Sequence, residues 1–505
     1  MAQEMPLPGY ALAELVQGLV DLGESAAQCR VTGLTLDSRT VMPGDLFIAL
    51  GGLHAHGADY LAQALERGAS AVLLDARNAP AYMPLSGRVP IVRVQGLSRL
   101  VGVLAARFFG DPSSAMTLYA VTGTNGKTSV SQFIAQALSL DQPCGLSGTL
   151  GSGLYGDLHA TGHTTPDAIT LQAELAEQYA LGVKSAVLEV SSHALDQKRV
   201  AGVQFDVAVF TNLSHEHLDY HGDMAAYARA KRRLFTQPGL QAAVFNLDDA
   251  YGAQWHDEVC GELRCIGYGF GARAQAEQGL TLCGSDLQLG AAGLSFQVSS
   301  PWGEARLETA LLGKFNAANL LAALGALLAA GIPFESAVER LGQVQTVPGR
   351  MERLGGGQQP TVVIDYAHTP DALQQVLQAL RGHCRGILWC VFGCGGERDR
   401  GKRPLMGQLA ESLADRVMLT NDNPRSEDPE GIIKDILRGV KDAHSVQVVR
   451  DRAAAIARAI QGAAADDWVL IAGKGHETEQ IIGAQRLPFS DHEVAARCLQ
   501  ERVYA

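Results

Sequence analysis

The chain has 505 residues, of which 47% are hydrophobic and 19% are charged, and its formal net charge is −12. A chain of this length is expected to form about three domains, each large enough to bury a core. The negative charge argues against binding nucleic acid or an anionic membrane through bulk charge, so a site for an acidic ligand must be built from particular basic residues. The nine cysteines are scattered without paired metal-ligand spacing, which predicts reduced thiols in a cytoplasmic protein.

Neither a signal peptide nor a membrane span is predicted. Residues 1–10 lack a basic segment followed by an apolar one. No apolar stretch reaches the roughly 18 residues that a transmembrane helix needs. The most apolar predicted helix, residues 319–331, is better explained as a core helix.

Residues 1–97 predict a small α/β domain. The expected elements are helices near residues 12–19 and 60–67 and buried strands at residues 46–50 and 71–74. The Asp-Ser-Arg sequence that follows Leu36 is a weak signal and favours a turn. Residues 76–90 are rich in Pro and Ala and favour a surface loop.

A phosphate-binding loop is predicted within residues 117–129. An apolar, β-branched run leads into Gly123-Thr124-Asn125-Gly126-Lys127-Thr128, and apolar residues at helical spacing follow. In a strand, glycine loop and helix of this order, backbone N–H groups bind phosphate, the lysine reaches the outer phosphates and the threonine holds Mg²⁺. Val121 departs from the general motif, which has a glycine there. The alternative is an ordinary strand–turn–helix with a chance Gly-Lys-Thr sequence.

The domain that contains this loop is expected to span residues 98–347. Alternating strands and helices predict a mostly parallel sheet with ligands at the carboxyl ends of its strands. The predicted strands are residues 185–190, 206–211 and 242–246. Glu189 and His217 lie at or after the ends of the first two, so both should converge with the phosphate loop at one edge. Residues 270–310 instead predict antiparallel strands with glycine-rich turns.

Glu189, His217 and Lys231 each allow two interpretations. Glu189 either shares Mg²⁺ with Thr128, because magnesium prefers oxygen ligands, or faces solvent at its strand end. His217 belongs to a histidine triplet within residues 215–221, whose spacing and acidic neighbours are not those of a structural zinc site. We favour one histidine that assists a second Mg²⁺ over a solvated loop. Lys231 lies in a basic helix, which composition alone interprets as a solvated face.

Residues 348–505 predict a second doubly wound α/β domain, which begins after a plausible hinge at Pro348-Gly349. The expected strands are residues 362–368, 386–392, 416–420, 446–449 and 468–472. Arg398, Arg425 and Glu477 follow such strands. Two guanidinium groups and one carboxylate suit a zwitterionic ligand, because the former bind carboxylates and the latter binds an ammonium. Independent surface charges are the alternative.

Together these motifs resemble the Mur ligase family over essentially the whole chain. The matching segments are Gly123-Thr124-Asn125-Gly126-Lys127-Thr128, Thr164-Thr165-Pro166, Glu189-Val190-Ser191-Ser192-His193 with Gln197 and Arg199, Asn212-Leu213-Ser214 leading to His217, Lys231, Asp365-Tyr366-Ala367-His368-Thr369-Pro370, and Asp422-Asn423-Pro424-Arg425. The last segment resembles the mark of members that use diaminopimelate, since lysine-adding relatives lack this arginine. His163, before Thr164, departs from the asparagine of some relatives.

The resemblance implies three α/β domains: residues 1–97 for a UDP-N-acetylmuramoyl (UDP-MurNAc) dipeptide, residues 98–347 as a P-loop ATPase, and residues 348–505 as a Rossmann-like amino-acid domain. It implies an ATP-dependent, ADP-forming ligase of peptidoglycan precursor synthesis. The reaction would add meso-2,6-diaminopimelate to the D-glutamate γ-carboxylate of UDP-MurNAc-L-Ala-D-Glu through an acyl phosphate. It further implies two Mg²⁺ ions, a monomer, a cytoplasmic location and no nucleic-acid partner.

The resemblance also implies roles for particular residues. The catalytic residues would be Lys127, Glu189, His217 and Lys231, and the metal ligands would be Thr128, Glu189, His217 and Lys231 as a carbamate. The ATP-binding residues would be Gly123, Thr124, Asn125, Gly126, Lys127, Thr128, Ser129, Asn316, Arg350, Asp365 and His368. The residues that hold the UDP-MurNAc dipeptide would be Leu36, Ser38, His54, Thr164, Thr165, Ser191, Gln197 and Arg199. The diaminopimelate residues would be Arg398, Asp422, Asn423, Pro424, Arg425, Gly473 and Glu477.

Two other functions share part of this pattern. A folylpolyglutamate synthetase-like ligase would have the same nucleotide loop and lysine, but the uridine-binding N-terminal domain and Asp422-Asn423-Pro424-Arg425 argue against it. A nucleotide-gated switch without ligase chemistry would need only the nucleotide loop. Binding of a labelled UDP sugar or of folate would separate the two ligases.

Overall fold

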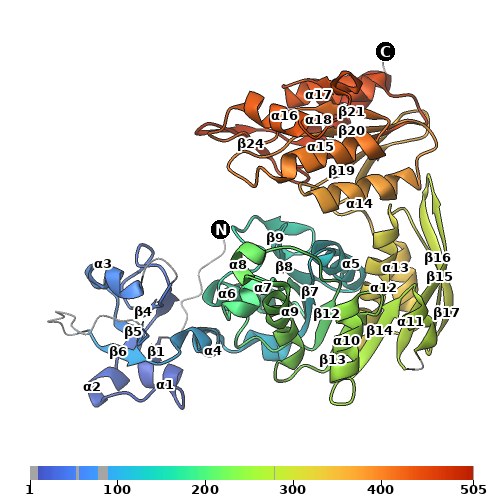
Figure 1. Ribbon diagram of the computed structural model, residues 1–505. Helices are drawn as coiled ribbons and strands as arrows, with labels where there is room; N and C mark the ends of the chain where they lie inside the picture. Colours follow the sequence, from blue (N-terminus) through green and yellow to red (C-terminus); the bar gives the residue numbers. More distant parts are fainter. Residues whose placement is uncertain (1–8, 53–55, 78–88, 278, 504–505) are drawn as a thin grey trace. The chain divides into compact units, whose positions relative to one another are not determined.

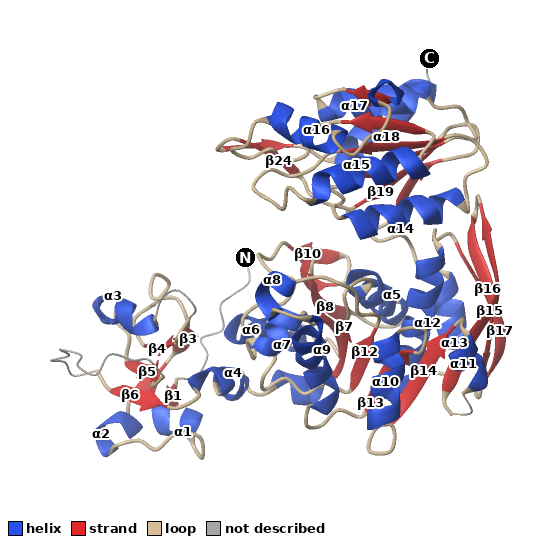
Figure 2. Ribbon diagram, viewed as in Figure 1, coloured by secondary structure: helices blue, strands red, loops and turns tan. Residues whose placement is uncertain are grey.

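The structure is a computed structural model that describes residues 9–52, 56–77, 89–277 and 279–503. The chain forms two compact units, one of residues up to 267 together with 325–331, and one of residues 268–324 together with 332 onward (Figure 1). Both units mix helices and strands, which confirms the predicted α/β class (Figure 2). The predicted domain boundaries at residues 97 and 347 stay predictions. Most of the loop predicted at residues 76–90 lies outside the described residues.

The first unit begins with a small parallel sheet in the order β3-β4-β5-β6. Its strands are β3 (Gly33–Thr35), β4 (Asp45–Ala49), β5 (Ala71–Asp75) and β6 (Ile91–Val94), preceded by a pair of short strands, β1 (Tyr10–Ala11) and β2 (Arg30–Val31). The accompanying helices are α1 (Leu12–Val16), α2 (Glu24–Ala27), α3 (Leu61–Glu66) and α4 (Val101–Phe108). Both faces of β4 are buried, since Leu46 and Phe47 belong to different cores. The two predicted strands and two predicted helices are confirmed, although the first helix stops at Val16, shortly before Gly18 adopts a φ of 73°.

A larger sheet in the same unit carries the phosphate loop. Its parallel strands, in spatial order, are β8 (Cys144–Gly148), β11 (Ser185–Glu189), β7 (Thr117–Thr122), β12 (Val207–Phe210) and β13 (Ala242–Asn246). Two antiparallel strands, β9 (Gly151–Leu154) and β10 (Asp157–His159), extend the sheet beyond β8. The connecting helices are α5 (Lys127–Ser139), α6 (Ala168–Ala180), α7 (Ser192–Asp196), α8 (Leu218–His221), α9 (Met224–Arg232) and α10 (Ala250–Val259). The predicted strands of this domain and their parallel arrangement are confirmed.

Helices cover both faces of this sheet, so its central strands β7, β11 and β12 are buried along nearly their whole length. On one face Leu118, Leu188 and Phe210 pack in a core with apolar residues of α6, α7, α9 and α10. Helix α5 packs against β7, β8 and β11 and contributes nothing to that core, which places it on the other face. The carboxyl ends of β7, β11 and β12 are therefore the open edge where loops can gather side chains.

The second unit contains three antiparallel strands, a helical segment and a doubly wound sheet. The antiparallel strands are β15 (Thr281–Gly290), β16 (Gly293–Ser300) and β17 (Gly303–Thr309), which confirms the prediction for residues 270–310. A short helix, α11 (Ala272–Ala276), precedes them, and α13 (Phe334–Gly342) packs on β17. The predicted core helix is α12 (Lys314–Ala329), and its apolar residues from Leu320 to Leu328 are buried.

The doubly wound sheet has the order β18-β19-β23-β20-β21-β22, with all strands parallel except β18. The strands are β18 (Glu352–Gly355), β19 (Thr361–Asp365), β20 (Leu388–Phe392), β21 (Arg416–Leu419), β22 (Val446–Val448) and β23 (Trp468–Ala472). The helices are α14 (Pro370–Arg381), α15 (Lys402–Leu413), α16 (Pro429–Leu437), α17 (Arg452–Gly462) and α18 (Asp491–Val503), and a hairpin of β24 (Glu479–Ile482) and β25 (Gln485–Pro488) follows β23. Helices α14 to α16 share one core and α17 and α18 share another, so both faces are covered (Figure 2).

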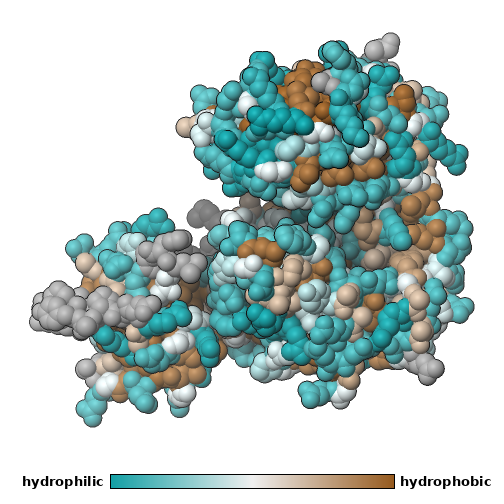
Figure 3. Space-filling model, viewed as in Figure 1, coloured by the Kyte–Doolittle hydropathy of each residue, from teal (hydrophilic) through white to brown (hydrophobic). Residues whose placement is uncertain are grey.

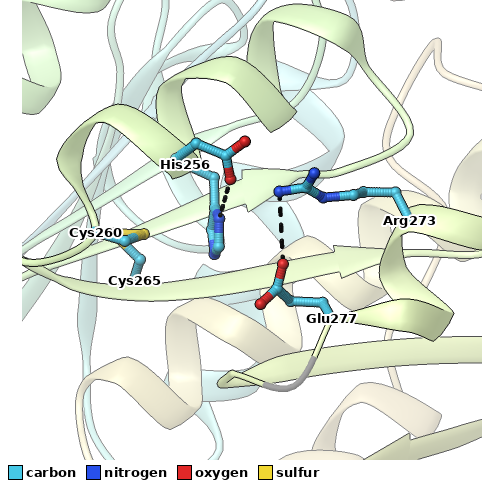
Figure 4. Close-up of a disulfide and its surroundings, with 6 residues drawn as sticks. His256, Cys260, Cys265, Arg273 and Glu277 are labelled. Atoms are coloured by element: carbon cyan, nitrogen blue, oxygen red, sulfur yellow. Dashed lines mark ion pairs between the residues drawn. A yellow bond between two sulfur atoms is a disulfide. The ribbon is translucent and has the colours of Figure 1, made fainter.

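The cysteine prediction needs one correction. Cys260, directly after α10, and Cys265, in β14 (Arg264–Gly269), are joined by a disulfide (Figure 4). The predicted reduced state of all nine cysteines is therefore wrong for this pair. A separation of five residues at a helix-to-strand turn brings two side chains together without any metal-ligand spacing. The remaining cysteines are free thiols.

The surface agrees with the charged composition. The face seen in Figure 3 is largely hydrophilic, with small hydrophobic patches between charged groups. Large exposed apolar side chains occur singly along the sequence, from Met42 to Leu487. Within the described residues, no helix combines the length and the apolar character that crossing a bilayer requires.

Candidate active site

The phosphate loop lies between β7 and α5, as predicted. Gly126 has a φ of 85° and is the N-cap of α5, so the helix starts at Lys127 and its N-terminus lies beside the loop. Gly123 has a φ of 151°, and a Cβ at this position would overlap the Thr211 hydroxyl. Both glycines are therefore required by the backbone.

Val121 departs from the general motif because it is a strand residue here. It is fully buried within β7 and is paired with Glu189 of β11 and Val209 of β12. The turn begins only at Gly123, two residues later. The position where the general motif has its first glycine is thus occupied by a core side chain.

The loop that follows β12 is hydrogen-bonded to the phosphate loop. The backbone N–H of Thr124 donates to the carbonyl oxygen of Asn212 (2.8 Å), and the N–H of Asn125 donates to Asn212 Oδ1 (3.0 Å). In return Asn212 Nδ2 donates to the Asn125 carbonyl oxygen (3.1 Å). The structure therefore brings the predicted Asn212-Leu213-Ser214 segment onto the phosphate loop.

Two lysines converge on one carbonyl group of this loop. Lys127 Nζ donates to the carbonyl oxygens of Gly123 and Thr124, both at 2.9 Å, and Lys231 Nζ donates to that of Gly123 at 2.7 Å. Lys231 is only 1% exposed and its Nζ lies 4.8 Å from the centre of the Tyr227 ring. Burial lowers the pKa of Lys231 well below its usual value, and the charge of Lys127 lowers this pKa further. The interpretation of Lys231 as part of a solvated basic face is therefore wrong.

Glu189 is buried at the end of β11 rather than facing solvent. It is 2% exposed, and its Oε2 accepts a hydrogen bond of 2.9 Å from the Thr128 hydroxyl. Thr149 donates to the same carboxylate from its N–H (2.9 Å, to Oε1) and from its hydroxyl (3.1 Å, to Oε2). Sequence reasoning missed Thr149, although its place directly after β8 is a signal of the kind that identified Glu189.

The donor set around Glu189 has the chemistry that Mg²⁺ requires. The Thr128 hydroxyl and the Glu189 carboxylate are hard oxygen ligands in direct contact. Within the described ranges, no group of three or more His, Cys, Asp or Glu side chains is arranged to hold a metal ion. A magnesium site at this edge would therefore include hydroxyl, phosphate or other oxygen ligands.

His217 lies near Tyr227 and within the electrostatic influence of Lys127 and Lys231. It adopts a left-handed φ of 56° as the N-cap of α8, and its ring centre is 6.1 Å from that of Tyr227. Burial is the main cause that lowers its pKa, and the neighbouring Glu216 carboxylate opposes this while Lys127 and Lys231 add to it. The ring also meets His193 edge to face at 4.9 Å. The Tyr227 hydroxyl shares a hydrogen bond of 3.1 Å with the Thr124 hydroxyl, so His217 meets the phosphate loop through the Tyr227 ring.

Five of the eight residues predicted to hold the UDP-MurNAc dipeptide form one hydrogen-bonded group. Thr165 donates to the Glu189 carbonyl oxygen (2.7 Å) and accepts from the Ser191 N–H (3.1 Å). Arg199 NH1 donates to the Thr165 carbonyl oxygen (2.8 Å), and the same guanidinium donates to Gln197 Oε1. Thr164 and Thr149 share a hydroxyl–hydroxyl hydrogen bond of 3.1 Å, which joins this group to Glu189. Leu36 and Ser38 lie instead beside the N-terminal sheet, where Ser38 donates to Gln63 (2.7 Å), and His54 lies outside the described residues.

In the second unit, three of the predicted ATP residues cluster at the end of β19. Asp365 is buried, and its carboxylate accepts hydrogen bonds from the N–H groups of Met351 and Ala367, both at 2.8 Å. Burial raises the pKa of Asp365, while Arg350 opposes the shift. The Arg350 guanidinium lies 5.0 Å from the centre of the Tyr366 ring, which also contacts the rings of His368 and His476. Asn316 is elsewhere in this unit, buried at the start of α12 with its Nδ2 donating to the Leu312 carbonyl oxygen.

The predicted amino-acid residues meet where β20, β21 and β23 end. Asn423 Nδ2 donates to Glu477 Oε2 (2.8 Å), and a Cβ on Gly473 would lie 2.7 Å from the carboxylate of Asp422. Arg425 NH1 donates to the Gly396 carbonyl oxygen (2.8 Å), in the loop that contains Arg398. Arg425 and Glu477 are therefore held by contacts with neighbouring loops, whereas Arg398 is exposed. Lys474, between Gly473 and Gly475, is missing from the predicted set although it contacts both Asn423 and Glu477.

Three family models match the chain. "Mur ligase family, catalytic domain" matches residues 30–109, "Mur ligase middle domain" matches residues 121–327 and "Mur ligase, glutamate ligase domain" matches residues 349–475. Together they cover most of the chain and include the phosphate loop and the Asp422–Arg425 segment.

Relatives of known name match over nearly the full length. The UDP-N-acetylmuramoyl-L-alanyl-D-glutamate–2,6-diaminopimelate ligase of Coxiella burnetii is 51% identical over 475 residues, which cover 94% of this chain and 96% of that one. The ligase of the same name from Pseudomonas aeruginosa is 50% identical over 467 residues, 92% of this chain and 94% of that one.

Solved structures agree with these matches. A structure of a UDP-N-acetylmuramoyl-L-alanyl-D-glutamate–2,6-diaminopimelate ligase is 36% identical, has a TM-score of 0.72 and covers 99% of this chain and all of its own. A folylpolyglutamate synthase from Mycobacterium tuberculosis, solved with ADP and AMPPCP, is 20% identical, with a TM-score of 0.58 over 74% of this chain and 92% of its own. The second likeness concerns the fold alone.

Proposed function

Because the chain belongs to the Mur ligase family, we propose that it is the ATP-dependent, ADP-forming ligase that joins meso-2,6-diaminopimelate to UDP-MurNAc-L-Ala-D-Glu in peptidoglycan precursor synthesis. The observation that carries this proposal is the Asp422–Arg425 loop beside Glu477, in a chain half identical to relatives named for this reaction. A guanidinium and a carboxylate at neighbouring strand ends suit an amino acid that carries carboxylates and ammonium groups.

The ATP phosphates would bind the loop of residues 123–129. The N–H groups at the start of α5 favour anions, and Lys127 needs only to leave the carbonyl groups of Gly123 and Thr124 to reach an outer phosphate. Asn316, Arg350, Asp365 and His368 would complete the ATP site. Arg350 supports this assignment, because its Nε is buried without a hydrogen-bond acceptor among the described residues.

Two Mg²⁺ ions would be held by Thr128, Glu189, His217 and a carbamate on Lys231. Bound Mg²⁺ would neutralise the negative charge that gathers as phosphate is transferred. The contact between Thr128 and Glu189 supports one site, since two oxygen ligands already lie together there.

A carbamate on Lys231 accounts for an otherwise unfavourable burial. An amine buried among carbonyl and aromatic groups is held more easily without its charge, and a neutral amine can attack CO₂. The new N–C bond uses the lone pair of Nζ, one proton is released, and the product is a carboxylate-bearing side chain. Lys231 then offers oxygen ligands instead of a second positive charge beside Lys127.

The UDP-MurNAc dipeptide would bind Thr164, Thr165, Ser191, Gln197 and Arg199, with Leu36, Ser38 and His54 at the nucleotide end. Its γ-carboxylate would attack the γ-phosphorus of ATP, the bond to the β-phosphate oxygen would break, and ADP would leave. The amine of diaminopimelate would then attack the acyl carbon, lose a proton and expel phosphate. Lys127 would hold the transferred phosphoryl group, and Arg398, Asp422, Asn423, Pro424, Arg425, Gly473 and Glu477 would orient the amino acid.

We also propose three domains with boundaries at residues 97 and 347, a monomeric state and a cytoplasmic location. The three family models, which match residues 30–109, 121–327 and 349–475 in turn, support a division into three domains.

Phosphate release tests the whole proposal. Purified protein with ATP, Mg²⁺ and UDP-MurNAc-L-Ala-D-Glu should release phosphate when meso-diaminopimelate is added, and much less with L-lysine or with no amino acid. Release that depends on folate and glutamate instead would favour the folylpolyglutamate reaction. A protein that binds ATP but releases no phosphate with any amino acid in the panel would be a nucleotide-gated switch.

A further inference from the structure

Lys474 is a fully buried lysine for which the proposed reaction has no role. It lies in the loop after β23 with 0% of its surface exposed. The flanking residues Gly473 and Gly475 have positive φ values of 115° and 54°, a conformation that glycine adopts without strain. Burying an ammonium group is unfavourable unless its N–H groups find acceptors, so the contacts of Nζ decide what this residue does.

Three acceptors match the three N–H donors of Lys474. Its Nζ donates to Glu477 Oε2 at 2.8 Å, to Asn423 Oδ1 at 3.1 Å and to the carbonyl oxygen of Glu479 at 2.7 Å. An ammonium group has three donors and no acceptor, so its hydrogen-bonding capacity is filled. The lysine thus joins the loop after β21, the loop after β23 and the first residue of β24.

These contacts fix the orientation of the Asn423 amide. Asn423 Oδ1 accepts from Lys474 and from the N–H of Ile481 (3.0 Å), so the oxygen must face these two donors. The Nδ2 group consequently faces Glu477 and donates to its Oε2 (2.8 Å). A rotated amide would place two donors against Lys474 and the Ile481 N–H.

Glu477 is held by one oxygen only. Its Oε2 accepts from Lys474 and Asn423, whereas no hydrogen bond from the described part of the chain reaches Oε1. The side chain is 30% exposed, in contrast to the buried lysine behind it. One carboxylate oxygen is therefore anchored and the other is available to a ligand.

We propose that Lys474 is a positioning residue for the amino-acid substrate, because its buried ammonium group holds Asn423 and Glu477 in the orientation that receives the ligand. The inference rests on the proposed function, in which Asn423 and Glu477 bind diaminopimelate. Lys474 does not touch the substrate. It sets the direction in which Glu477 Oε1 and the Asn423 amide are presented.

The test compares Lys474→Met with wild-type enzyme and with Lys434→Met, an exposed lysine on α16 in the same unit. Phosphate release is measured while each substrate is varied in turn. Lys474→Met should raise the KM for meso-diaminopimelate about 10- to 100-fold, because two polar groups lose a charged donor. The KM values for ATP and for the UDP-MurNAc dipeptide should stay within about twofold of wild type, as should all three in Lys434→Met.

A double variant separates positioning from a general structural effect. In a Glu477→Gln background, adding Lys474→Met should raise the KM for diaminopimelate by less than about threefold, since residues that act as a unit are non-additive. Lys474→Arg, which keeps a charged donor, should regain part of the loss. If Lys474→Met does not fold, Lys474→Gln replaces it in both comparisons.

The outcomes distinguish this inference from the proposed function. Wild-type enzyme that fails to use diaminopimelate would overturn the proposed function itself. If wild-type enzyme does use diaminopimelate, three results would overturn only the role of Lys474. These are an unchanged KM for diaminopimelate in Lys474→Met, an equal rise in all three KM values, and full additivity of Lys474→Met with Glu477→Gln.

Discussion

Lys231 in the first unit and Lys474 in the second are both buried lysines, 1% and 0% exposed, yet their surroundings differ. Lys231 has a carbonyl acceptor and an aromatic ring, with a second lysine nearby. Lys474 has a carboxylate, an amide oxygen and a carbonyl oxygen, one for each N–H. The first environment disfavours the ammonium group and the second satisfies it.

This difference shows that burial alone does not indicate what a lysine does. An amine held without a carboxylate partner is suited to covalent modification, here the proposed carbamate. An ammonium group with a full set of acceptors is suited to holding other side chains in place. The Nζ atoms of both lysines contact loops at the carboxyl ends of parallel strands. The hydrogen-bond partners of each lysine, rather than its position in the sheet, therefore decide its role.

Replacing Lys231 should have the largest effect and tests one half of this contrast. Lys231→Ala should lower kcat about 10²- to 10³-fold, because an oxygen ligand for charge neutralisation at the phosphates is lost. Phosphate release measures the rate. Short carboxylic acids such as formate or acetate should restore part of the activity in Lys231→Ala but none in Lys474→Met.

Lys184→Ala is the matched control for Lys231, since Lys184 Nζ also lies over a tyrosine ring, at 5.7 Å from Tyr179. It should behave as wild type. Near-wild-type activity in Lys231→Ala would contradict the carbamate, and a crystallographic map without extra density on Nζ would contradict it independently.

Arg425→Ala should have the next largest effect and addresses the second unit. Loss of a guanidinium partner for a substrate carboxylate should reduce kcat/KM for diaminopimelate by about 2–3 kcal/mol. Arg425→Lys should recover only part, because an ammonium group cannot form the bidentate contact. Arg438→Ala, which removes an exposed arginine paired with Asp435, is the control. Unchanged KM and kcat in Arg425→Ala would exclude its assignment to the amino-acid site.

Thr149→Val tests a residue of the phosphate site that motif matching did not identify. The change removes the hydroxyl group that donates to Glu189 and contacts Thr164, and it retains the backbone N–H. Loss of one hydrogen bond to a carboxylate should reduce kcat/KM for ATP or the dipeptide about tenfold. Thr161→Val, at a partly exposed threonine whose hydroxyl donates to the His163 carbonyl oxygen, should leave both values unchanged. Equal behaviour of the two variants would place Thr149 outside the site.

The smallest predicted effect concerns pH and a residue of the second unit outside both sites. His383 Nε2 accepts from the Gly313 N–H (2.9 Å), so Nδ1 carries the proton that is donated to the Gly290 carbonyl oxygen (2.7 Å). Burial lowers the pKa of His383 below 6.5, with Gly290 opposing the shift. Because the unfolded chain then binds the proton more readily, this contribution to stability is full above pH 6.5 and is lost as the pH falls through 6.5 towards the folded-state pKa.

The measurement is the difference in unfolding free energy between wild type and His383→Gln. This free-energy difference should shrink by at most about 1.4 kcal/mol per pH unit below pH 6.5, which is the slope expected when unfolding takes up one proton. A difference that is constant from pH 7.5 to 5.5 would mean that His383 does not titrate on unfolding.

Much of the fold follows from local sequence. Each predicted strand of the two larger sheets is present, because short apolar runs bounded by glycine or polar residues are typical of parallel strands that are buried on both faces. The phosphate loop can also be predicted from local sequence, because Gly123 and Gly126 adopt backbone angles that few other residues tolerate. The strand-end positions by themselves predict a common site for Arg425 and Glu477, whereas the resemblance to the Mur ligase family adds Asn423 to it.

What the sequence by itself determined is therefore the order of elements, the glycines that the phosphate loop requires and the strand ends from which site residues project. Only the tertiary structure decided that Glu189 and Lys231 are buried, that Thr149 and Lys474 belong with the predicted residues, and that Cys260 pairs with Cys265. Periodicity reports which face of an element is apolar, whereas the burial of a charged group depends on which distant segments supply its acceptors. Those partners are up to 108 residues away for Lys231 and 51 for Lys474, beyond the reach of any local pattern.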